Sequence, residues 1–303
     1  MTYVNQGRQL GMVGVLEPFI FGGSISGYYM CGTNHHDAWC GGCGTGQNYY
    51  FNDIWSISLT TDGNAVDTGG SMGGGYTGGT GCSSTTHGYW AGAGNQIEKF
   101  SFTNPGAGFN DVGDLAASLT GSTGGNSSAT NGYVASHGNI YRFSFATDGG
   151  GPDVGNLTTN RTFSVGSNSS THGYQSGGTN SNVIDKFAFA NEATANDVGD
   201  LPSNLQDDCG ASSETHGYHF GRGQIYRYSF SADGNATDVG NLGNSSGSRG
   251  TGISSLTHGY ACGGAVHETN MEKFSFANHT STTVGNLGTG QTTNRYAGAT
   301  NQY

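Results

Sequence analysis

Thr215-His-Gly-Tyr218, Ile225-Tyr-Arg-Tyr-Ser-Phe230 and Asp233-Gly-Asn-Ala-Thr-Asp-Val-Gly-Asn-Leu242 form the stretch of sequence that decides the fold. The same order of short segments recurs along almost the whole chain. A period of about 40–45 residues is typical of repeat architectures, in which each unit buries its apolar face against the next one. The Gly-Tyr pair marks the period at spacings of 61, 44, 41, 44 and 42 residues, which are the differences between Gly27, Gly88, Gly132, Gly173, Gly217 and Gly259.

A nearly constant hexapeptide follows five of the six Gly-Tyr pairs. Its residues alternate between two faces, which predicts a β-strand whose aromatic side chains stack on a neighbouring sheet. No stretch has a convincing helical period, so we expect almost no helix. Each repeat offers about four strands, the size of a propeller blade, and its Gly/Ser/Thr-rich segment suits a crowded inner strand. The hexapeptides are Ile97–Phe102, Ile140–Phe145, Ile184–Phe189, Ile225–Phe230 and Met271–Phe276, and Ile54–Leu59 is a worn copy.

The two ends of the chain resemble parts of one further repeat. Ala299-Thr-Asn-Gln-Tyr303 matches Ala129-Thr-Asn-Gly-Tyr133, and Met12–Leu16 resembles a degenerate copy of the motif Asp-Val-Gly-Asn-Leu. A blade shared by both termini would close the ring without a free sheet edge. We therefore predict an all-β propeller of seven blades, or of six if the terminal pieces only cap an existing blade. The single domain of residues 1–303 would have blades at about 17–70, 71–115, 116–157, 158–201, 202–242 and 243–287, and a split blade of 288–303 plus 1–16.

The composition excludes several classes of function. Charged residues make up only 10% of the chain, and the net charge is −11. This balance argues against a surface for nucleic acid, which needs a basic stripe. No apolar run is long enough to insert into a membrane. The first ten residues do not resemble a signal peptide, so we expect the chain to fold where it is made or to leave by another route.

The repeat resembles the kelch repeat. The double glycines Gly177-Gly178 and Gly263-Gly264 match it, and Arg161, Arg249 and Arg295 match its inner-strand arginine. The sequence from Asp233 to Leu242 is similar to kelch-like repeats in virion structural proteins of marine tailed phages that infect cyanobacteria. The resemblance implies a scaffold and transfers no catalytic residue.

Most charged and histidine side chains are tied to repeat positions. Lys99, Arg142, Lys186, Arg227 and Lys273 share one strand position, and we expect them to pair with repeat acids such as Asp111 and Asp197 or with carbonyls between blades. The alternative is a ring of positive charge for an anionic ligand. Histidine precedes Gly-Tyr in four copies, where we expect it to stabilise a turn rather than to bind metal or sense pH. These histidines are His87, His172, His216 and His258.

Two further patterns point to metal ions. The loops Asp62–Asp67 and Asp233–Asp238 space three oxygen side chains as a calcium loop does, although turns built by Asp and Asn side chains explain them more simply. The first repeat also carries an insertion whose Cys-x-x-Cys and histidines suit zinc. Its candidate zinc ligands are Cys31, His35, Cys40 and Cys43. A disulfide or free thiols are the alternative there. Buried free thiols that stand in for small apolar residues are expected for Cys31, Cys82, Cys209 and Cys262.

The insertion is also the best candidate for a contact surface, because long loops on a rigid scaffold often carry the binding residues. The residues predicted to bind a ligand are His35, His36, Asp37, Trp39, Tyr49 and Tyr50.

These observations favour a non-enzymatic structural and adhesion protein of a virus particle. It would decorate a tail, fibre or capsid, contact other virion proteins, form a homo-oligomer in the assembly and bind host-surface polysaccharide as a receptor. One alternative is a carbohydrate-binding or adhesion module on a bacterial cell surface. A glycan-degrading propeller enzyme is the third hypothesis, and it would need a cluster of acids, arginines or tyrosines outside the repeat positions.

Overall fold

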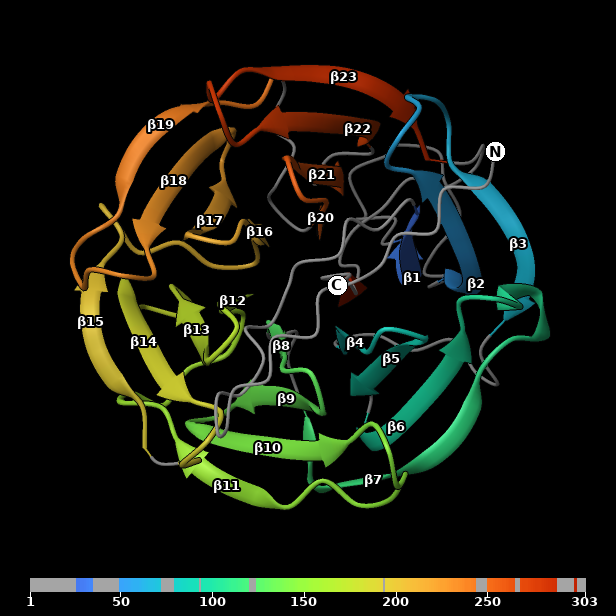
Figure 1. Cartoon of the computed structure of the whole chain (residues 1–303), viewed down its shortest axis with the longest axis horizontal. Coiled ribbons are helices and arrows are strands. Elements are labelled where there is room, and N and C mark those ends of the chain that lie inside the picture. The colour runs from blue at the N-terminus through green and yellow to red at the C-terminus, as the bar shows by residue number, and fades with distance from the viewer. Residues whose placement is uncertain are drawn as a thin grey trace, which may run out of the picture.

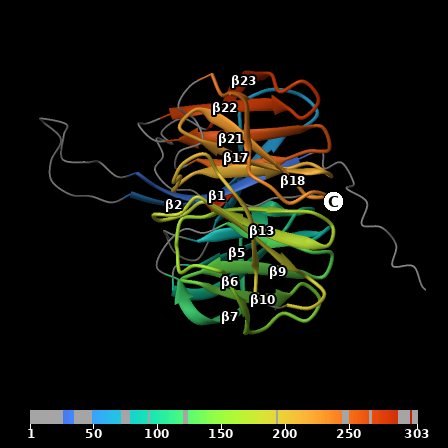
Figure 2. The ribbon, with the colours of Figure 1, turned by 90° about the vertical axis from the view of Figure 1, so that its left-hand side faces the viewer.

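The computed structural model describes residues 26–34, 49–71, 79–92, 94–119, 124–192, 194–243, 250–264, 268–287 and 297–298. In these ranges the chain forms six four-stranded antiparallel sheets and one short 3-10 helix, η1 (Pro105–Ala107). The sheets stand as blades around a common axis, with one edge strand inside and the other at the rim (Figure 1). Figure 2 shows the ring from its side. The protein is thus an all-β propeller, as the sequence predicted.

The first sheet contains strands from both ends of the chain, and the others follow in chain order. From the innermost strand outward, the first sheet consists of β24 (Ala297–Gly298), β1 (Ser26–Asn34), β2 (Tyr49–Ser58) and β3 (Val66–Ser71). The second consists of β4 (Thr80–Ser83), β5 (His87–Gly92), β6 (Gly94–Ser101) and β7 (Asn110–Leu119). The third consists of β8 (Gly125–Ser127), β9 (Asn131–Ser136), β10 (Asn139–Ser144) and β11 (Asp153–Asn156).

The remaining three sheets repeat this plan. The fourth consists of β12 (Val165–Asn168), β13 (His172–Ser176), β14 (Val183–Ala188) and β15 (Asn196–Asp200). The fifth consists of β16 (Cys209–Ser212), β17 (His216–Gly221), β18 (Gln224–Ser229) and β19 (Thr237–Asn241). The sixth consists of β20 (Thr251–Ser254), β21 (His258–Gly264), β22 (Glu268–Ser275) and β23 (Ser281–Asn286). No helix among the described residues is long and apolar enough to span a membrane.

Each of the six inner strands contains glycine, and five of them also contain serine, because neighbouring strands nearly touch at the axis. A Cβ atom on Gly252 would lie 1.8 Å from the carbonyl oxygen of Gly210, and one on Gly125 would lie 2.0 Å from that of Gly81. Serine hydroxyls then join these strands, since the amide of Ser212 donates to Ser254 Oγ at 2.9 Å. The expectation of a crowded inner strand of small residues is confirmed.

The Gly-Tyr pair and the aromatic hexapeptide hold adjacent blades together. In the fourth sheet, Gly173 leaves room for the ring of Phe187, which a Cβ would approach to 2.3 Å. Tyr174 stacks on Phe230 of the next sheet with ring centroids 4.7 Å apart, and its hydroxyl donates to the Phe230 carbonyl at 3.2 Å. Equivalent stacking pairs join Tyr89 to Phe145, Tyr133 to Phe189 and Tyr218 to Phe276.

The ring closes between the sixth and first sheets. Tyr260 donates a hydrogen bond to the Leu59 carbonyl at 3.3 Å, and Ile57 packs in one buried cluster with Ile253 and Met271. The segment Ala297–Gly298 was expected to belong to a separate seventh blade, but it pairs with Tyr29 and Met30 of β1 as the innermost strand of the first sheet. The described residues thus contain six sheets, and the short inner strand joins a sheet that would otherwise lack one. Residues 1–16, the other part of the predicted split blade, lie outside the described residues.

Candidate functional site

The insertion that was predicted to bind a ligand or metal lies largely outside the described residues. His35, His36, Asp37, Trp39, Cys40 and Cys43 fall between residues 35 and 48. Their flanks are described: β1 and β2 form an antiparallel hairpin in which Asn34 faces Tyr49 and Thr33 faces Tyr50. Cys31 lies at an irregularity of this pairing, between Met30 and Gly32. The insertion therefore connects the second and third strands of the first sheet, and its zinc and ligand sites stay predictions.

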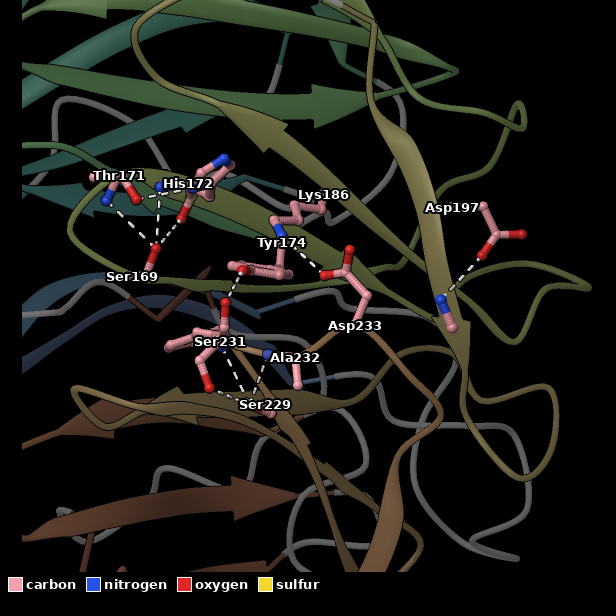
Figure 3. A network of polar contacts seen from close by, with 12 residues as sticks. Ser169, Thr171, His172, Tyr174, Lys186, Asp197, Ser229, Ser231, Ala232 and Asp233 are labelled. Carbon is pink, nitrogen blue, oxygen red and sulfur yellow. Dashed lines mark hydrogen bonds and ion pairs between the residues drawn. The ribbon is translucent and has the colours of Figure 1, made fainter.

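At the opposite end of the blades, a contact between a strand cation and a loop of the next sheet recurs at five of the six junctions in the described residues. Figure 3 shows the copy between the fourth and fifth sheets. Lys186 on β14 pairs with Asp233 of the fifth sheet through Nζ and Oδ1 at 2.8 Å. His172 begins the adjacent strand β13, and its Nδ1 lies 2.8 Å from Thr171 Oγ1. The unit thus combines a turn near the axis with an ion pair farther out.

The Asp-Gly-Asn loops are clasps between blades. Asp233 pairs with Lys186 of the preceding sheet, while Asn235 Oδ1 accepts the amide of Asp200 at 3.0 Å. Asp238 Oδ1 instead accepts the amide of Gly240, two residues further on. The three oxygens therefore face three different partners. A calcium ion would have to displace these contacts, and the described residues contain no group of three or more His, Cys, Asp or Glu side chains that could hold a metal. Calcium stays a prediction.

The strand cations do pair between blades, but with other acids than expected. Lys99 binds Asp148 at 2.6 Å, Arg142 binds Glu192, and Lys273 binds Asp62 at 2.8 Å. Each acid lies on the loop between the third and fourth strands of the next sheet. The expected partners, Asp111 and Asp197, form other contacts. The Oδ1 atom of each accepts the backbone amide two residues further on, at 3.1 Å. Such turns keep these carboxylates at the rim.

The cation–loop contact between the fifth and sixth sheets involves a histidine in place of an acid. Arg227 Nη1 meets His279 Nε2 at 3.1 Å, and His279 occupies the loop position that carries an acid in the first, third, fourth and fifth sheets. The imidazole also stacks on Phe274, with centroids 5.8 Å apart and planes 10° apart. No sequence pattern drew attention to His279, although its alignment with Glu192 and Asp233 across the repeats was a usable signal.

The histidines of the turns form a local side-chain hydrogen bond. In all four copies Nδ1 bonds the hydroxyl of the preceding threonine at 2.8 Å. Asn131 replaces histidine in the third sheet and donates to Thr130 Oγ1 at 2.9 Å. Burial lowers the pKa of each of the four imidazoles below its ordinary value.

A buried ion pair organises the fourth sheet at the other end of the blades. Arg161 Nη1 lies 2.9 Å from Asp185 Oδ2, and both side chains are fully buried. Arg161 also donates to the Gln175 carbonyl at 3.0 Å, and Asp185 accepts the amide and hydroxyl of Thr158. Arg161 therefore precedes the inner strand β12 rather than lying within it. Its contacts are architectural, because a buried charge requires such partners.

Sequence reasoning missed one constellation that resembles catalytic machinery. Ser176 Oγ lies 3.0 Å from His219 Nδ1, and His219 Nε2 lies 3.1 Å from Asp208 Oδ2. Serine, histidine and acid are thus linked in series, as in hydrolases. However, Ser176 and His219 are fully buried between the fourth and fifth sheets, and Ser176 Oγ also approaches the Val165 carbonyl. A substrate cannot reach this hydroxyl, so the group is a packing contact between blades.

The buried cysteines fit the expectation for free thiols. Cys82, Cys209 and Cys262 are buried and form no disulfide. Burial raises the pKa of the Cys82 and Cys262 thiols to about 12, and that of Cys209 well above its ordinary value. A thiol with so high a pKa stays protonated at neutral pH and is a poor nucleophile.

No protein-family model matches the chain, and no curated protein matches it. The kelch and phage resemblances therefore depend on the quoted motifs, and the function must be argued from the residues.

Proposed function

We propose that the chain is a non-enzymatic structural and adhesion protein of a virus particle. As a rigid propeller it would decorate a tail, fibre or capsid and bind host-surface polysaccharide. The observation that carries the adhesion element is the single long insertion, which interrupts a repeat whose strand lysines are engaged in ion pairs between blades. A rigid ring with one exceptional hairpin suits binding better than catalysis, since binding residues concentrate on loops of rigid scaffolds. The assignment to a virion is supported by the resemblance of the repeat sequence, above all Asp233–Leu242, to repeats of phage structural proteins.

The virion assignment can be tested in a host in which the particles assemble. The tagged full chain should co-sediment with purified particles through a density gradient, and salt washes should not remove it. A chain that stays at the top of the gradient, while a known particle protein reaches the dense band, would refute the assignment.

The adhesion element has a separate test. Full-length protein should bind host-surface glycans on an array, and Trp39→Ala or Tyr50→Ala should abolish this binding, because aromatic rings stack on sugar faces. Leu256→Ala is the matched control, since Leu256 is an exposed apolar residue on a turn of the sixth sheet. Equal binding by all three variants would disprove a role for the insertion.

A module on a bacterial cell surface is the second candidate. It shares the polysaccharide-binding element and differs in location. Immunolabelling of intact uninfected cells would support it, whereas labelling confined to particles would exclude it.

A further inference from the structure

The junction between the fifth and sixth sheets carries a strand cation that faces a histidine, whereas an acid neutralises the strand cation at four other junctions. At those junctions the strand cation meets Asp148, Glu192, Asp233 or Asp62. Here Arg227 meets only the imidazole of His279, and no carboxylate within the described ranges forms an ion pair with it. The chain as a whole has a net charge of −11, so this place departs from both the repeat and the average surface.

The geometry fixes how His279 is used. Arginine is always a donor, so His279 Nε2 must accept and the neutral ring carries its proton on Nδ1. The backbone of His279 has φ = 61°, comparable to 46° at Glu192 and 37° at Asp148, which occupy the corresponding loops. Stacking on Phe274 holds the ring in place. The imidazole is therefore a fixed substitute for an acid, with its remaining N–H available as a donor.

His216 adds a third basic group. Its Nδ1 bonds Thr215 Oγ1, and both Arg227 and His279 lie close enough for their charges to lower its pKa in addition to the effect of burial. Burial and Arg227 likewise lower the pKa of His279. At the junctions with Asp148, Asp233 and Asp62, by contrast, the acid opposes this effect on the neighbouring histidine. Arg227, His279 and His216 are all partly exposed, so a ligand can reach them.

We propose that Arg227, His279 and His216 form a binding site for an oxyanion of an acidic polysaccharide, either a carboxylate or a sulfate ester. The guanidinium pairs with planar oxyanions through two parallel N–H donors, and the imidazole N–H groups supply further hydrogen bonds. The ligand would bind beside His279 and supply the negative charge that a loop carboxylate supplies to the strand cation at four other junctions. This inference rests on the proposed glycan-binding function and assigns the charged part of the ligand to a surface distinct from the insertion.

The test measures binding of the full chain to three immobilised polymers: polygalacturonate, dextran sulfate and neutral dextran. The wild type should bind one or both acidic polymers and should ignore dextran. His279→Asp places a carboxylate beside Arg227, as at the other junctions, and should weaken binding by at least about ten-fold, the effect of losing a charge-assisted hydrogen bond. Binding should also strengthen from pH 7.5 to pH 5.5, because an anion favours the protonated imidazoles.

The matched control is Arg222→Ala, which removes one positive charge from an exposed turn at the other end of the same sheet. It should leave binding unchanged, and the melting temperature of His279→Asp should equal or exceed that of the wild type. A preference for one acidic polymer would identify the oxyanion. Unchanged binding by His279→Asp, an equal loss in Arg222→Ala, or no binding of either acidic polymer would overturn the proposal. The gradient and array experiments would still decide the proposed function, since they do not depend on these three residues.

Discussion

Replacing Asp185 with asparagine should destabilise the propeller strongly, because it leaves the buried guanidinium of Arg161 without its counter-charge. Both side chains are fully buried, and their atoms are 2.9 Å apart. Removing one partner of such a pair costs about 3–5 kcal/mol, since the remaining charge stays in a poorly solvating interior. The carboxylate also accepts two hydrogen bonds from Thr158, of which an amide oxygen can keep only part.

For a chain of this length, about 1 kcal/mol corresponds to a shift in melting temperature of roughly 2 °C. Asp185→Asn should therefore melt about 6–10 °C below the wild type. Differential scanning calorimetry and urea denaturation would measure this, with the urea m-value checked for constancy. The matched control is Asp233→Asn, because Asp233 is 53% exposed where it pairs with Lys186, the residue next to Asp185. An exposed pair contributes only about 0–1 kcal/mol.

A double variant separates the cost of an unpaired charge from the worth of the pair. Arg161→Met combined with Asp185→Leu replaces both ions with apolar side chains and should recover much of the stability lost in Asp185→Asn. The reasoning is refuted if Asp185→Asn melts within about 2 °C of the wild type, which corresponds to the effect of an exposed pair. It is also refuted if the exposed control loses as much stability as the buried variant.

Three further predictions concern glycine, histidine and cysteine. Gly173→Ala should cost about 1–3 kcal/mol in urea denaturation, because the added methyl would overlap the Phe187 ring; Gly94→Ala, with no atom within 4 Å, should test the backbone effect alone. Acidification from pH 7 to pH 5 should lower the melting temperature, because the turn histidines have pKa values below the ordinary 6.5 and the unfolded chain binds protons first. His172→Asn, which copies Asn131, should reduce the dependence of the melting temperature on pH, and an unchanged dependence would contradict the assignment. Cys82, Cys209 and Cys262 should resist iodoacetamide at pH 8 until denaturant is added, and rapid labelling of the native protein would show that these thiols are accessible.

The repeats alternate between two kinds of blade, which the predicted single repeat does not distinguish. Strands with lysine carry a buried acid just before it, as in Glu98-Lys99, Asp185-Lys186 and Glu272-Lys273, whereas strands with arginine carry tyrosine, as in Tyr141-Arg142 and Tyr226-Arg227. The acids accept amide groups from the segment that enters their sheet, as Asp185 does from Thr158 and Glu272 from Gly243. A single consensus repeat hides this pattern, because Lys and Arg, or Glu and Tyr, then count as interchangeable residues at one position.

The partners of repeated charges could not be chosen from the sequence. Asp111, Asp197 and Asp233 all recur at fixed distances from the strand cations, and spacing alone gives no reason to prefer one of them. Among the described residues, four strand cations form ion pairs with loop acids of the next sheet, whereas Asp111 and Asp197 accept backbone amides of their own strands. The candidate anion site at Arg227 was missed for the same reason, since the absence of an acid matters only once the facing loop is known.

The sequence by itself determined the all-β class, the blade as the repeating unit, the inner strand of small residues and the stacking of aromatic side chains between sheets. These features depend on local periodicity and on residue size, and both can be seen in the sequence of each repeat. Only the tertiary structure decided that Ala297–Gly298 completes the first sheet, that the Asp-Gly-Asn loops act as clasps, and that one junction lacks its acid. Each of these depends on contacts between residues in different repeats, because closing the ring brings together groups that no local pattern relates.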